Sequence, residues 1–382
     1  MAIDEKTLNQ LESSLLRTRR LKAEIERKLE YGDLNRDILM ALLLRNPNII
    51  DPDTARYLLN KKILSKDDFN DCNIDFNFVD LLLEEEPTDP ADASEFVPIQ
   101  SIAPGSTEVY FWGMPAAGKS CALGALLSIA NNGDDTMMQQ QCQGGSYMSH
   151  LAEIFHHDGA YGYLPAGTAI MNTYEMRFSL IRDEKEHPLS LIDLSGELFK
   201  CLYKKFKNNV LNDDEQTAFD TLNNLLVEHA SENRKLHFFV IEYGAQDKKI
   251  DGLRQDEYLK CAAEYLNQLG VFREYSDAIY IVLTKADKAG NFDNRQDEDD
   301  HYYNYMSQNY RSFYSSLRKM CKDNSINGGQ LQFVPFTIGD IVLRRMCRFN
   351  ATSAREILDY IVERSAYVER NKLGRIVRIL RQ

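Results

Sequence analysis

One stretch of the 382-residue chain has the residue types and the spacing of a phosphate-binding loop. The segment 113–120 reads Gly-Met-Pro-Ala-Ala-Gly-Lys-Ser and matches the P-loop (Walker A) pattern G-x-x-x-x-G-K-[ST]. Its glycines let backbone N–H groups turn toward a phosphate chain, Lys119 supplies a positive charge to the β- and γ-phosphates, and the Ser120 hydroxyl can coordinate Mg²⁺. The motif predicts nucleotide binding. The expected contacts are Gly113, Met114, Pro115, Ala116, Ala117, Gly118, Lys119, Ser120 and Cys121.

A second motif follows an apolar run farther along the chain. The run 189–192 is followed by Asp193-Leu194-Ser195-Gly196-Glu197, which contains the pattern D-x-x-G. Asp193 can hold a water molecule on Mg²⁺, and the Gly196 N–H can reach a γ-phosphate without steric hindrance. The pattern alone is common in turns, so its weight comes from its position after a strand and downstream of the P-loop.

A third motif could read the base of a nucleotide. Thr284-Lys285-Ala286-Asp287 stands at the end of the apolar run 278–283. The Asp287 carboxylate can accept hydrogen bonds from the N1–H and the exocyclic amine of guanine, a pair of donors that adenine lacks. The Lys285 stem can lie along the base. The motif therefore favours guanine over adenine.

The elements that must position these motifs alternate between short strands and helices. Stretches with helical periodicity, among them 119–130, 198–230 and 257–269, separate the apolar runs. The expected strands are 108–112, 174–181, 189–194, 236–243, 278–284 and 331–336. This alternation predicts an α/β fold with a mostly parallel six-stranded sheet and helices on both faces.

The N-terminal part has a different pattern. Residues 1–83 show leucine and isoleucine at helical spacing, which predicts a small helical domain, either a helical bundle or a coiled coil. Residues 84–104 form an acidic, proline-containing linker. Residues 105–382 are then the nucleotide-binding domain, with insertions near 131–167 and 288–310 and a C-terminal helix over 354–382. The stretch 288–300 is expected to be a solvated loop.

Charge and composition narrow the classes of function. The formal net charge is −13, and residues 65–95 carry eleven acidic side chains against a single lysine, which disfavours a general nucleic-acid binder. The seven cysteines have no zinc or redox spacing and are expected to be reduced. Without an apolar run of about 18 residues, a leader or a lipidation signal, we expect a cytoplasmic protein with no stable membrane anchoring.

The three motifs in this order resemble the P-loop GTPases, specifically their Ras-like branch. The resemblance covers roughly 108–367 and implies GTP or GDP as the ligand and Mg²⁺ as the cofactor. It implies Mg²⁺ contacts from Ser120, Asp193 and a switch threonine, Thr168, with Thr173 as the alternative. It implies that the backbone N–H of Ile338 or Gly339 reaches the base carbonyl. The implied catalytic residues are Lys119, Thr168, Gly196 and Glu197.

Three positions depart from the pattern of that family. Thr284 replaces the usual asparagine of N-K-x-D, and Pro115 stands where a glycine is common and could crowd an inserted arginine. Glu197 replaces the glutamine that orients the attacking water. Its charge would repel the γ-phosphate unless it is compensated, so hydrolysis is expected to be slow.

The resemblance implies a molecular switch that binds GTP with Mg²⁺, hydrolyses it slowly and relays the nucleotide state to a protein partner through the switch regions and the N-terminal module. The long insertions resemble those of bacterial regulatory or defence-associated GTPases. Two alternatives stay open: a hydrolysis-deficient pseudo-GTPase that acts as a scaffold, and an ATP-using P-loop enzyme. The pseudo-GTPase differs from the switch in whether Glu197 supports hydrolysis. The ATP-using enzyme differs from it in the base preference that Asp287 would set.

Overall fold

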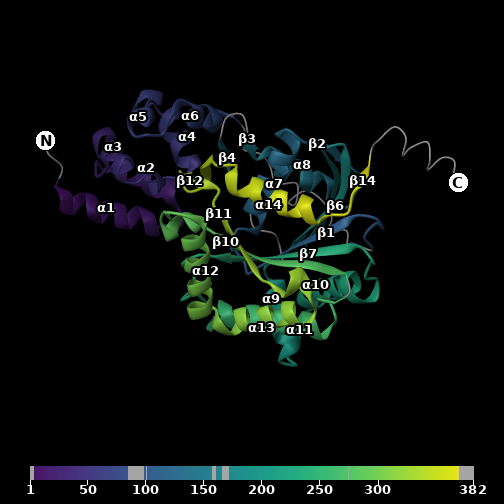
Figure 1. Ribbon diagram of the computed structural model, residues 1–382. Coiled ribbons are helices and arrows are strands. Elements are labelled where there is room, and N and C mark those ends of the chain that lie inside the picture. The colour runs from purple at the N-terminus through teal and green to yellow at the C-terminus, as the bar shows by residue number, and fades with distance from the viewer. Residues whose placement is uncertain are drawn as a thin grey trace. The chain divides into compact units, whose positions relative to one another are not determined.

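A computed structural model describes residues 4–84, 99, 101–156, 161–165, 172–273 and 275–369 (Figure 1). The chain divides into two compact units. Unit 1 comprises residues 1–88, 154–164 and 339–350, and unit 2 comprises residues 89–153, 165–338 and 351–382. Most of the predicted acidic linker, residues 85–98 and 100, lies outside the described residues.

Unit 1 begins with a bundle of short helices. Asp51 caps one of them by accepting a hydrogen bond from the Thr54 N–H, and Pro52 occupies its first position. Leucine, isoleucine and phenylalanine side chains from the helices form one buried core, so the bundle replaces the coiled-coil alternative. The helices are α1 (Glu5–Arg17), α2 (Leu21–Glu30), α3 (Arg36–Arg45), a 3₁₀ turn (Pro47–Ile49), α4 (Pro52–Asn60), α5 (Lys66–Asp71) and α6 (Phe76–Leu83).

Two later segments of the chain complete unit 1. They form a four-stranded antiparallel sheet in the order β12-β13-β4-β3. Tyr163, Val342 and Met346 join the core of the N-terminal helices. Arg344 donates from its guanidinium to the backbone carbonyl oxygens of Leu15, at 3.0 Å, and of Asn48, at 2.9 Å. The strands are β3 (Phe155–His156), β4 (Tyr161–Tyr163), β12 (Gly339–Val342) and β13 (Met346–Phe349).

Unit 2 is built on a sheet of eight strands. Its main path has the order β11-β10-β7-β1-β6-β5-β2, and β14 pairs with β6. The contacts among β11, β10, β7, β1 and β6 are parallel, whereas β5, β2 and β14 pair antiparallel. The strands are β1 (Thr107–Trp112), β2 (Thr136–Gln139), β5 (Thr173–Arg182), β6 (Lys185–Leu194), β7 (Arg234–Glu242), β10 (Ser276–Thr284), β11 (Gln332–Phe336) and β14 (Val368–Glu369).

The mixed α/β fold is confirmed, but the predicted number of six strands is wrong. All six expected strands are present. Of the two additional strands, β2 comes from the insertion after the P-loop helix and forms an edge of the sheet, and β14 comes from the segment near the C-terminus and pairs with the first residues of β6. Strand β2 is partly exposed and β14 is exposed, so neither has the apolar run that marks a buried strand.

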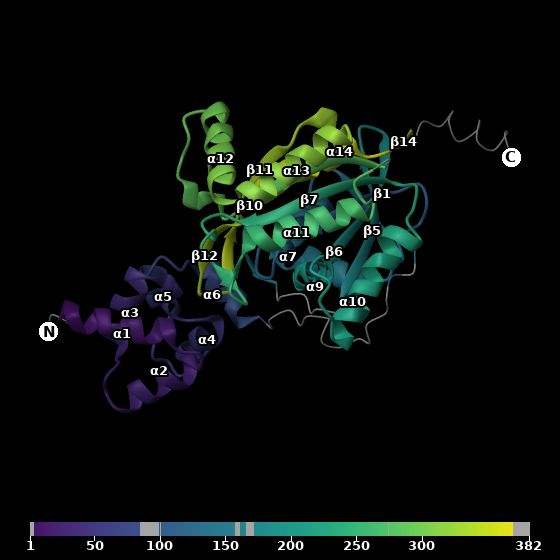
Figure 2. The ribbon, with the colours of Figure 1, turned by 90° about the horizontal axis from the view of Figure 1, so that it is seen from below.

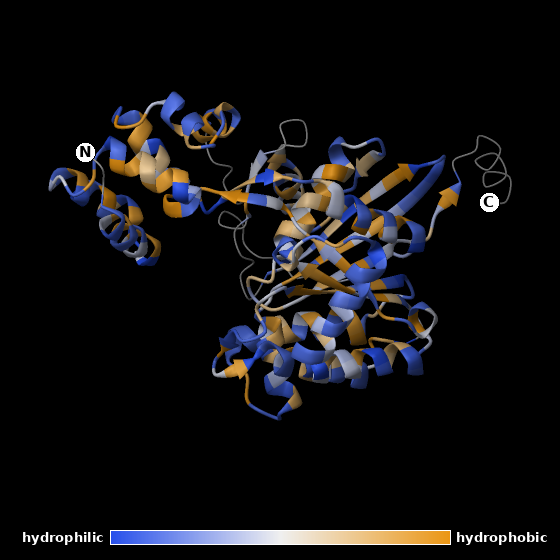
Figure 3. Cartoon of the chain, turned by 60° about the vertical axis from the view of Figure 1, so that its left-hand side comes forward, coloured by the Kyte–Doolittle hydropathy of each residue, from blue (hydrophilic) through white to orange (hydrophobic). Residues whose placement is uncertain are grey.

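Helices cover both faces of this sheet (Figures 1 and 2). Tyr110 and Trp112 of β1 pack toward the side of α9, α11 and α13. The helices α7, α8 and α14 lie on the other side. Apolar residues gather on the strands between these layers in Figure 3. The helices are α7 (Lys119–Asn132), α8 (Gly145–Glu153), α9 (Leu198–Phe206), α10 (Asp213–Asn223), α11 (Gln255–Gln268), α12 (Arg295–Asn309), α13 (Arg311–Asp323) and α14 (Thr352–Arg364).

The remaining short elements are a π-helical turn (Asn224–Glu228), the hairpin β8 (Lys249–Ile250) and β9 (Leu253–Arg254), and 3₁₀ turns at Ala286–Ala289 and Ile326–Gly329.

The predicted helical stretch 198–230 contains α9 and α10, which are separate because Asn212 and Glu215 form a capping box that starts α10. Two other predictions need correction. The predicted loop 288–300 contains the start of α12, where Asn294 accepts from the Asp297 N–H and acidic residues occupy the first turn. The C-terminal helix ends at Arg364, with Ser365 extended, and residues 370–382 lie outside the described chain. Within the described residues, no helix has both the length and the apolar character needed to cross a membrane.

Candidate functional site

The predicted motifs meet at one edge of the sheet in unit 2. Asp193 pairs in register with Phe111, one residue before the end of β1. Thr284 pairs in register with Glu242 on one side and with Phe336 on the other, and these are the last residues of β7 and β11. The carboxyl ends of parallel strands share one edge of a sheet, where ligands of open α/β folds bind. The P-loop, the D-x-x-G loop and the predicted base-reading loop therefore all leave the sheet there.

The P-loop connects β1 directly to α7 in the conformation that its glycines permit. Gly118 has φ +92°, and Ala116 adopts φ +61°, a left-handed backbone that alanine rarely takes. Gly113 lies so close to β7 that a β-carbon there would come within 2.5 Å of the Val240 carbonyl oxygen. The loop is held against the neighbouring strand and opens at the start of a helix, which is the geometry of an anion-binding site.

Lys119 lies inside this loop. Its ammonium donates to the carbonyl oxygens of Gly113, at 3.0 Å, and Met114, at 3.4 Å. Burial lowers the pKa of Lys119, and the negative charges of Asp193 and Glu197 act in the opposite direction. The buried cation therefore lies within electrostatic reach of the two carboxylates of the D-x-x-G segment.

Asp193 is completely buried at the carboxyl end of β6. Its Oδ2 accepts a hydrogen bond of 3.0 Å from the hydroxyl of Tyr147, which α8 contributes. The described residues hold no group of three or more His, Cys, Asp or Glu able to bind a metal unaided. A Mg²⁺ that is bound together with nucleotide phosphates needs few protein ligands, all of them oxygen. Asp193 and the Ser120 hydroxyl in the first turn of α7 fit such a site.

Gly196 passes directly against the P-loop. A β-carbon at this position would overlap the backbone nitrogen of Pro115 and would come within 2.7 Å of the carbonyl carbon of Met114. Real β-carbons do not approach other atoms this closely, so the position accepts only glycine without a shift of one loop. The close approach brings the Gly196 backbone beside the loop that would hold the γ-phosphate.

Glu197 does not carry an isolated charge. Its Oε2 lies 2.8 Å from the ammonium of Lys200, which also lies 3.4 Å from Asp251. The hydrogen bond to Glu197 raises the pKa of Lys200. The compensation that a carboxylate needs at this position is therefore present, three residues farther along the chain.

In the predicted base-reading motif 284–287, Thr284 connects two loops. Its buried hydroxyl donates to the Ala117 carbonyl oxygen at 2.7 Å and lies 3.3 Å from the Ile241 carbonyl oxygen. The threonine thereby ties the base-reading loop to the P-loop. Lys285 adopts φ +56° and its ammonium lies 2.5 Å from Glu242 Oε1. Asp287 is exposed in the 3₁₀ turn after β10.

The predicted switch threonine and the predicted base-flanking residues are less clearly placed at this edge of the sheet. Thr168 lies outside the described residues, and Thr173 is buried at the start of β5, paired with Leu194. Ile338 is the last residue of a unit 2 segment, and Gly339 is the first residue of β12 in unit 1. A β-carbon at Gly339, which has φ +100°, would overlap the carbonyl oxygen of Arg348.

Two residues that the motifs did not indicate also belong to this site. Lys200 follows Glu197 by one helical turn, so the spacing rule for oppositely charged pairs could have found it. Tyr147 lies in an insertion, 46 residues before its partner Asp193. No local pattern marks a contact of this kind.

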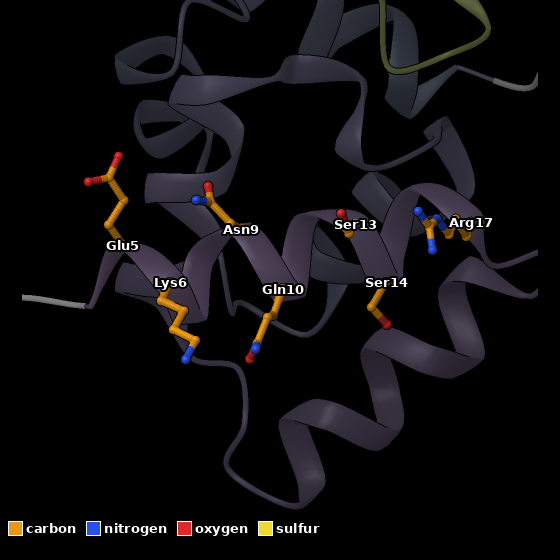
Figure 4. A pocket seen from close by; sticks show the side chains of 7 residues that line it. All are labelled: Glu5, Lys6, Asn9, Gln10, Ser13, Ser14 and Arg17. Atoms are coloured by element: carbon orange, nitrogen blue, oxygen red, sulfur yellow. The ribbon is translucent and has the colours of Figure 1, made fainter.

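A separate hollow runs along α1 of unit 1. It is lined by seven polar side chains of this one helix: Glu5, Lys6, Asn9, Gln10, Ser13, Ser14 and Arg17. In Figure 4 these side chains are spread along the helix and do not converge on one point. We assign no chemistry to it.

Comparison with known proteins gives structural matches at low similarity. No family model and no curated protein sequence matches the chain. Among solved structures, Methanosarcina barkeri Roco2 RocCORdC bound to GDP is 11% identical over 72% of this chain, with a TM-score of 0.28, and the match spans 54% of that chain. The SRb-GTP/SRX complex from Chaetomium thermophilum is 15% identical over 67% of this chain and 99% of that chain, with a TM-score of 0.32.

A third match is the Saccharomyces cerevisiae Ski7 GTPase-like domain bound to GTP. It is 18% identical over 61% of this chain and 43% of that chain, with a TM-score of 0.29. The assignment of the fold depends on the chain itself: the order β11-β10-β7-β1-β6-β5 with only β5 antiparallel, and a P-loop between β1 and α7. Unit 2 has a Ras-like α/β fold with a P-loop after its first strand.

Proposed function

We propose that the chain binds GTP and GDP together with Mg²⁺, hydrolyses GTP slowly and relays the nucleotide state to a protein partner. The observation that carries this proposal is the meeting of Lys119, Asp193, Gly196 and Asp287 at one edge of the sheet. Lys119 and the P-loop N–H groups would bind the phosphates. The Asp287 carboxylate would select guanine by accepting from its two neighbouring donors.

The residues proposed to hold Mg²⁺ are Ser120, Asp193 and Thr168, the last carried over from the family resemblance. Bound Mg²⁺ would neutralise negative charge on the β- and γ-phosphates. The Gly196 N–H would donate to the γ-phosphate and thereby distinguish GTP from GDP. Release of that bond after hydrolysis would free the D-x-x-G loop, which is the switching step.

Slow hydrolysis follows from the pairing of Glu197. Its carboxylate could accept a proton from the attacking water, but it accepts a hydrogen bond from Lys200 in this structure. The ammonium of Lys200 reduces the repulsion between the Glu197 carboxylate and the γ-phosphate. The same ion pair engages the carboxylate that would otherwise orient the attacking water. The same observation favours the second candidate function, a pseudo-GTPase in which the nucleotide is structural and does not turn over.

The relay to a partner is supported by the path of the chain. Unit 1 takes up residues 154–164 immediately before the proposed switch threonine, and residues 339–350 immediately after the proposed base-flanking Ile338. The segments that would sense the nucleotide are thus joined covalently to the strands of unit 1. We propose that unit 1 presents the nucleotide state to the partner.

Single-turnover release of phosphate from GTP in Mg²⁺ tests this function. We expect slow release, and we expect Lys119→Ala to weaken nucleotide binding about a hundredfold, because charge-assisted hydrogen bonds contribute ~1.5–3 kcal/mol each. Lys249→Ala, an exposed lysine in β8, is the matched control and should leave both unchanged. Guanine binding without any release would support the pseudo-GTPase, and equal binding by the Lys119 variant would contradict the proposed phosphate site.

A further inference from the structure

The insertion after the P-loop helix places one tyrosine on the proposed Mg²⁺ site. Tyr147 lies in the first turn of α8, and its hydroxyl donates a hydrogen bond of 3.0 Å to Asp193 Oδ2. Both side chains are buried, with 6% of Tyr147 and none of Asp193 exposed. A buried carboxylate depends on its hydrogen-bond donors, because water does not replace them.

The tyrosine ring is held in place by a second ring. Tyr147 stacks on Tyr174 with the ring centroids 4.2 Å apart and an angle of 26° between the planes. Tyr174 is the residue of β5 that pairs directly with Asp193 of β6. The strand pairing that places Asp193 thus also places the ring that supports its hydrogen-bond donor.

The start of α8 is attached to the same strand by backbone contacts. The Gly144 N–H donates to the Glu175 carbonyl oxygen at 2.8 Å, and the Glu175 N–H donates to Gln143 Oε1 at 3.0 Å. A β-carbon at Gly144 would come within 2.6 Å of that carbonyl oxygen, so the approach requires glycine. The position of Tyr147 is therefore supported by the stacked ring of Tyr174 and by the attachment of the start of α8 to β5.

We propose that Tyr147 is a positioning residue for the Mg²⁺ site. Its hydroxyl holds the Asp193 carboxylate in the orientation in which this carboxylate accepts a hydrogen bond from a Mg²⁺-bound water. The insertion that carries α8 thereby sets the affinity for Mg²⁺, and through it the lifetime of the bound nucleotide. This inference rests on the proposed function, and it adds to the motif-derived site a residue that lies outside all three motifs.

The test measures how long a fluorescent GDP analogue stays bound as the free Mg²⁺ concentration is varied with EDTA. Tyr147→Phe keeps the stacked ring and removes only the hydroxyl. We expect it to raise the free Mg²⁺ needed for half-maximal retention of nucleotide by about tenfold, the lower end of the effect of removing a partner of a metal-holding group. The dissociation rate in excess EDTA should equal that of the unaltered protein, because no metal is bound under that condition.

Tyr174→Phe is the matched control. It removes the hydroxyl of the other stacked ring, which bonds Asn172 and not Asp193, and it should leave the Mg²⁺ dependence unchanged. A Tyr147→Phe curve that superimposes on that of the unaltered protein would overturn the inference. A protein that binds no GDP analogue at any Mg²⁺ concentration would instead overturn the proposed function.

A double-mutant cycle with Asp193→Asn separates positioning from a general loss of packing. If the hydroxyl acts through Asp193, Tyr147→Phe should have no further effect on Mg²⁺-dependent retention in the Asp193→Asn background. Independent, additive effects of the two substitutions would contradict the inference. Should Tyr147→Phe fail to fold, Tyr147→Met takes its place, because methionine fills buried space and has no hydrogen-bond donor. It should again raise the free Mg²⁺ needed for half-maximal retention of nucleotide, and retention equal to that of the unaltered protein would overturn the inference.

Discussion

The phosphate end and the base end of the proposed site are built in different ways. At the phosphate end, Gly113 and Gly196 lie against neighbouring backbone, and Lys119 and Asp193 are buried. At the base end, Asp287 is exposed in a short turn. Thr284 is buried there, and its hydroxyl reaches back to the P-loop carbonyl oxygen of Ala117.

This difference separates two tasks. The position of the phosphate end follows from steric contacts between backbone segments, so it tolerates almost no added atom. At the base end, the exposed Asp287 carboxylate is proposed to select the ligand by hydrogen bonding. We therefore expect substitutions at the phosphate end to change affinity and the distinction between GTP and GDP, and substitutions at the base end to change the choice of base.

At the phosphate end, a large effect is expected for Gly196→Ala. The added methyl group would overlap the Pro115 backbone and displace the N–H that is proposed to bind the γ-phosphate. Loss of one hydrogen bond to a charged group predicts a GTP affinity about tenfold to a hundredfold lower. The affinity for GDP, which has no γ-phosphate, should stay close to that of the unaltered protein. Calorimetric titration with a non-hydrolysable GTP analogue and with GDP measures both.

Gly145→Ala is the control for that substitution. A β-carbon at Gly145 would meet only the Cys142 sulfur, at 3.9 Å, and the residue lies at the start of a helix, where alanine is well tolerated. Both affinities should be unchanged. An unaltered ratio of GTP to GDP affinity in Gly196→Ala would show that the close approach of the two loops does not serve the γ-phosphate.

A smaller effect is expected for Thr284→Val. Valine keeps the shape of the side chain but leaves the Ala117 carbonyl oxygen without the hydroxyl donor. The free energy of unfolding should fall by about 1–2 kcal/mol, the cost of one lost buried hydrogen bond. Urea denaturation of the nucleotide-free protein measures it, and Thr284→Ser, which retains the hydroxyl, should lose less. The preference for guanine should survive, and its loss in Thr284→Val would show that base selection does not reside in Asp287 alone.

Much of the phosphate end could be predicted from the sequence because it depends on local patterns. The spacing of the P-loop residues and the apolar runs before Asp193 and Thr284 placed each motif at a strand end, and the structure confirms these positions. The predicted start of β6 was four residues late. Residues 185–188 are partly polar, and the hairpin that begins β6 turns through Asp183 and Glu184, both with positive φ. Asp183 suits such a turn, but Glu184 stands where a glycine is usual, so the strong Asn-Gly or Asp-Gly signal is missing.

A turn without typical turn residues also explains why the sequence does not predict that residues 339–350 belong to unit 1. Their hairpin turns through Leu343 and Arg344, which also have positive φ and are not typical turn residues. The bonds from Arg344 to the carbonyl oxygens of Leu15 and Asn48 join residues that are 329 and 296 positions apart. Contacts of this kind, like that between Tyr147 and Asp193, arise from tertiary packing and leave no periodic pattern in the chain.

The most direct test of the central claim, a guanine-nucleotide site with Asp287 as its base-reading residue, is a competition experiment. A bound fluorescent GDP analogue is displaced with GTP, ATP and xanthosine triphosphate, first from the unaltered protein and then from Asp287→Asn. We predict that GTP displaces the analogue at least about a hundredfold better than ATP. The Asp287 carboxylate accepts two hydrogen bonds from guanine, and adenine lacks that pair of donors. Asp287→Asn should abolish this preference and admit xanthine, whose C2 carbonyl can accept from the asparagine amide. Equal displacement by ATP and GTP, or an unchanged preference in the Asp287 variant, would contradict the account.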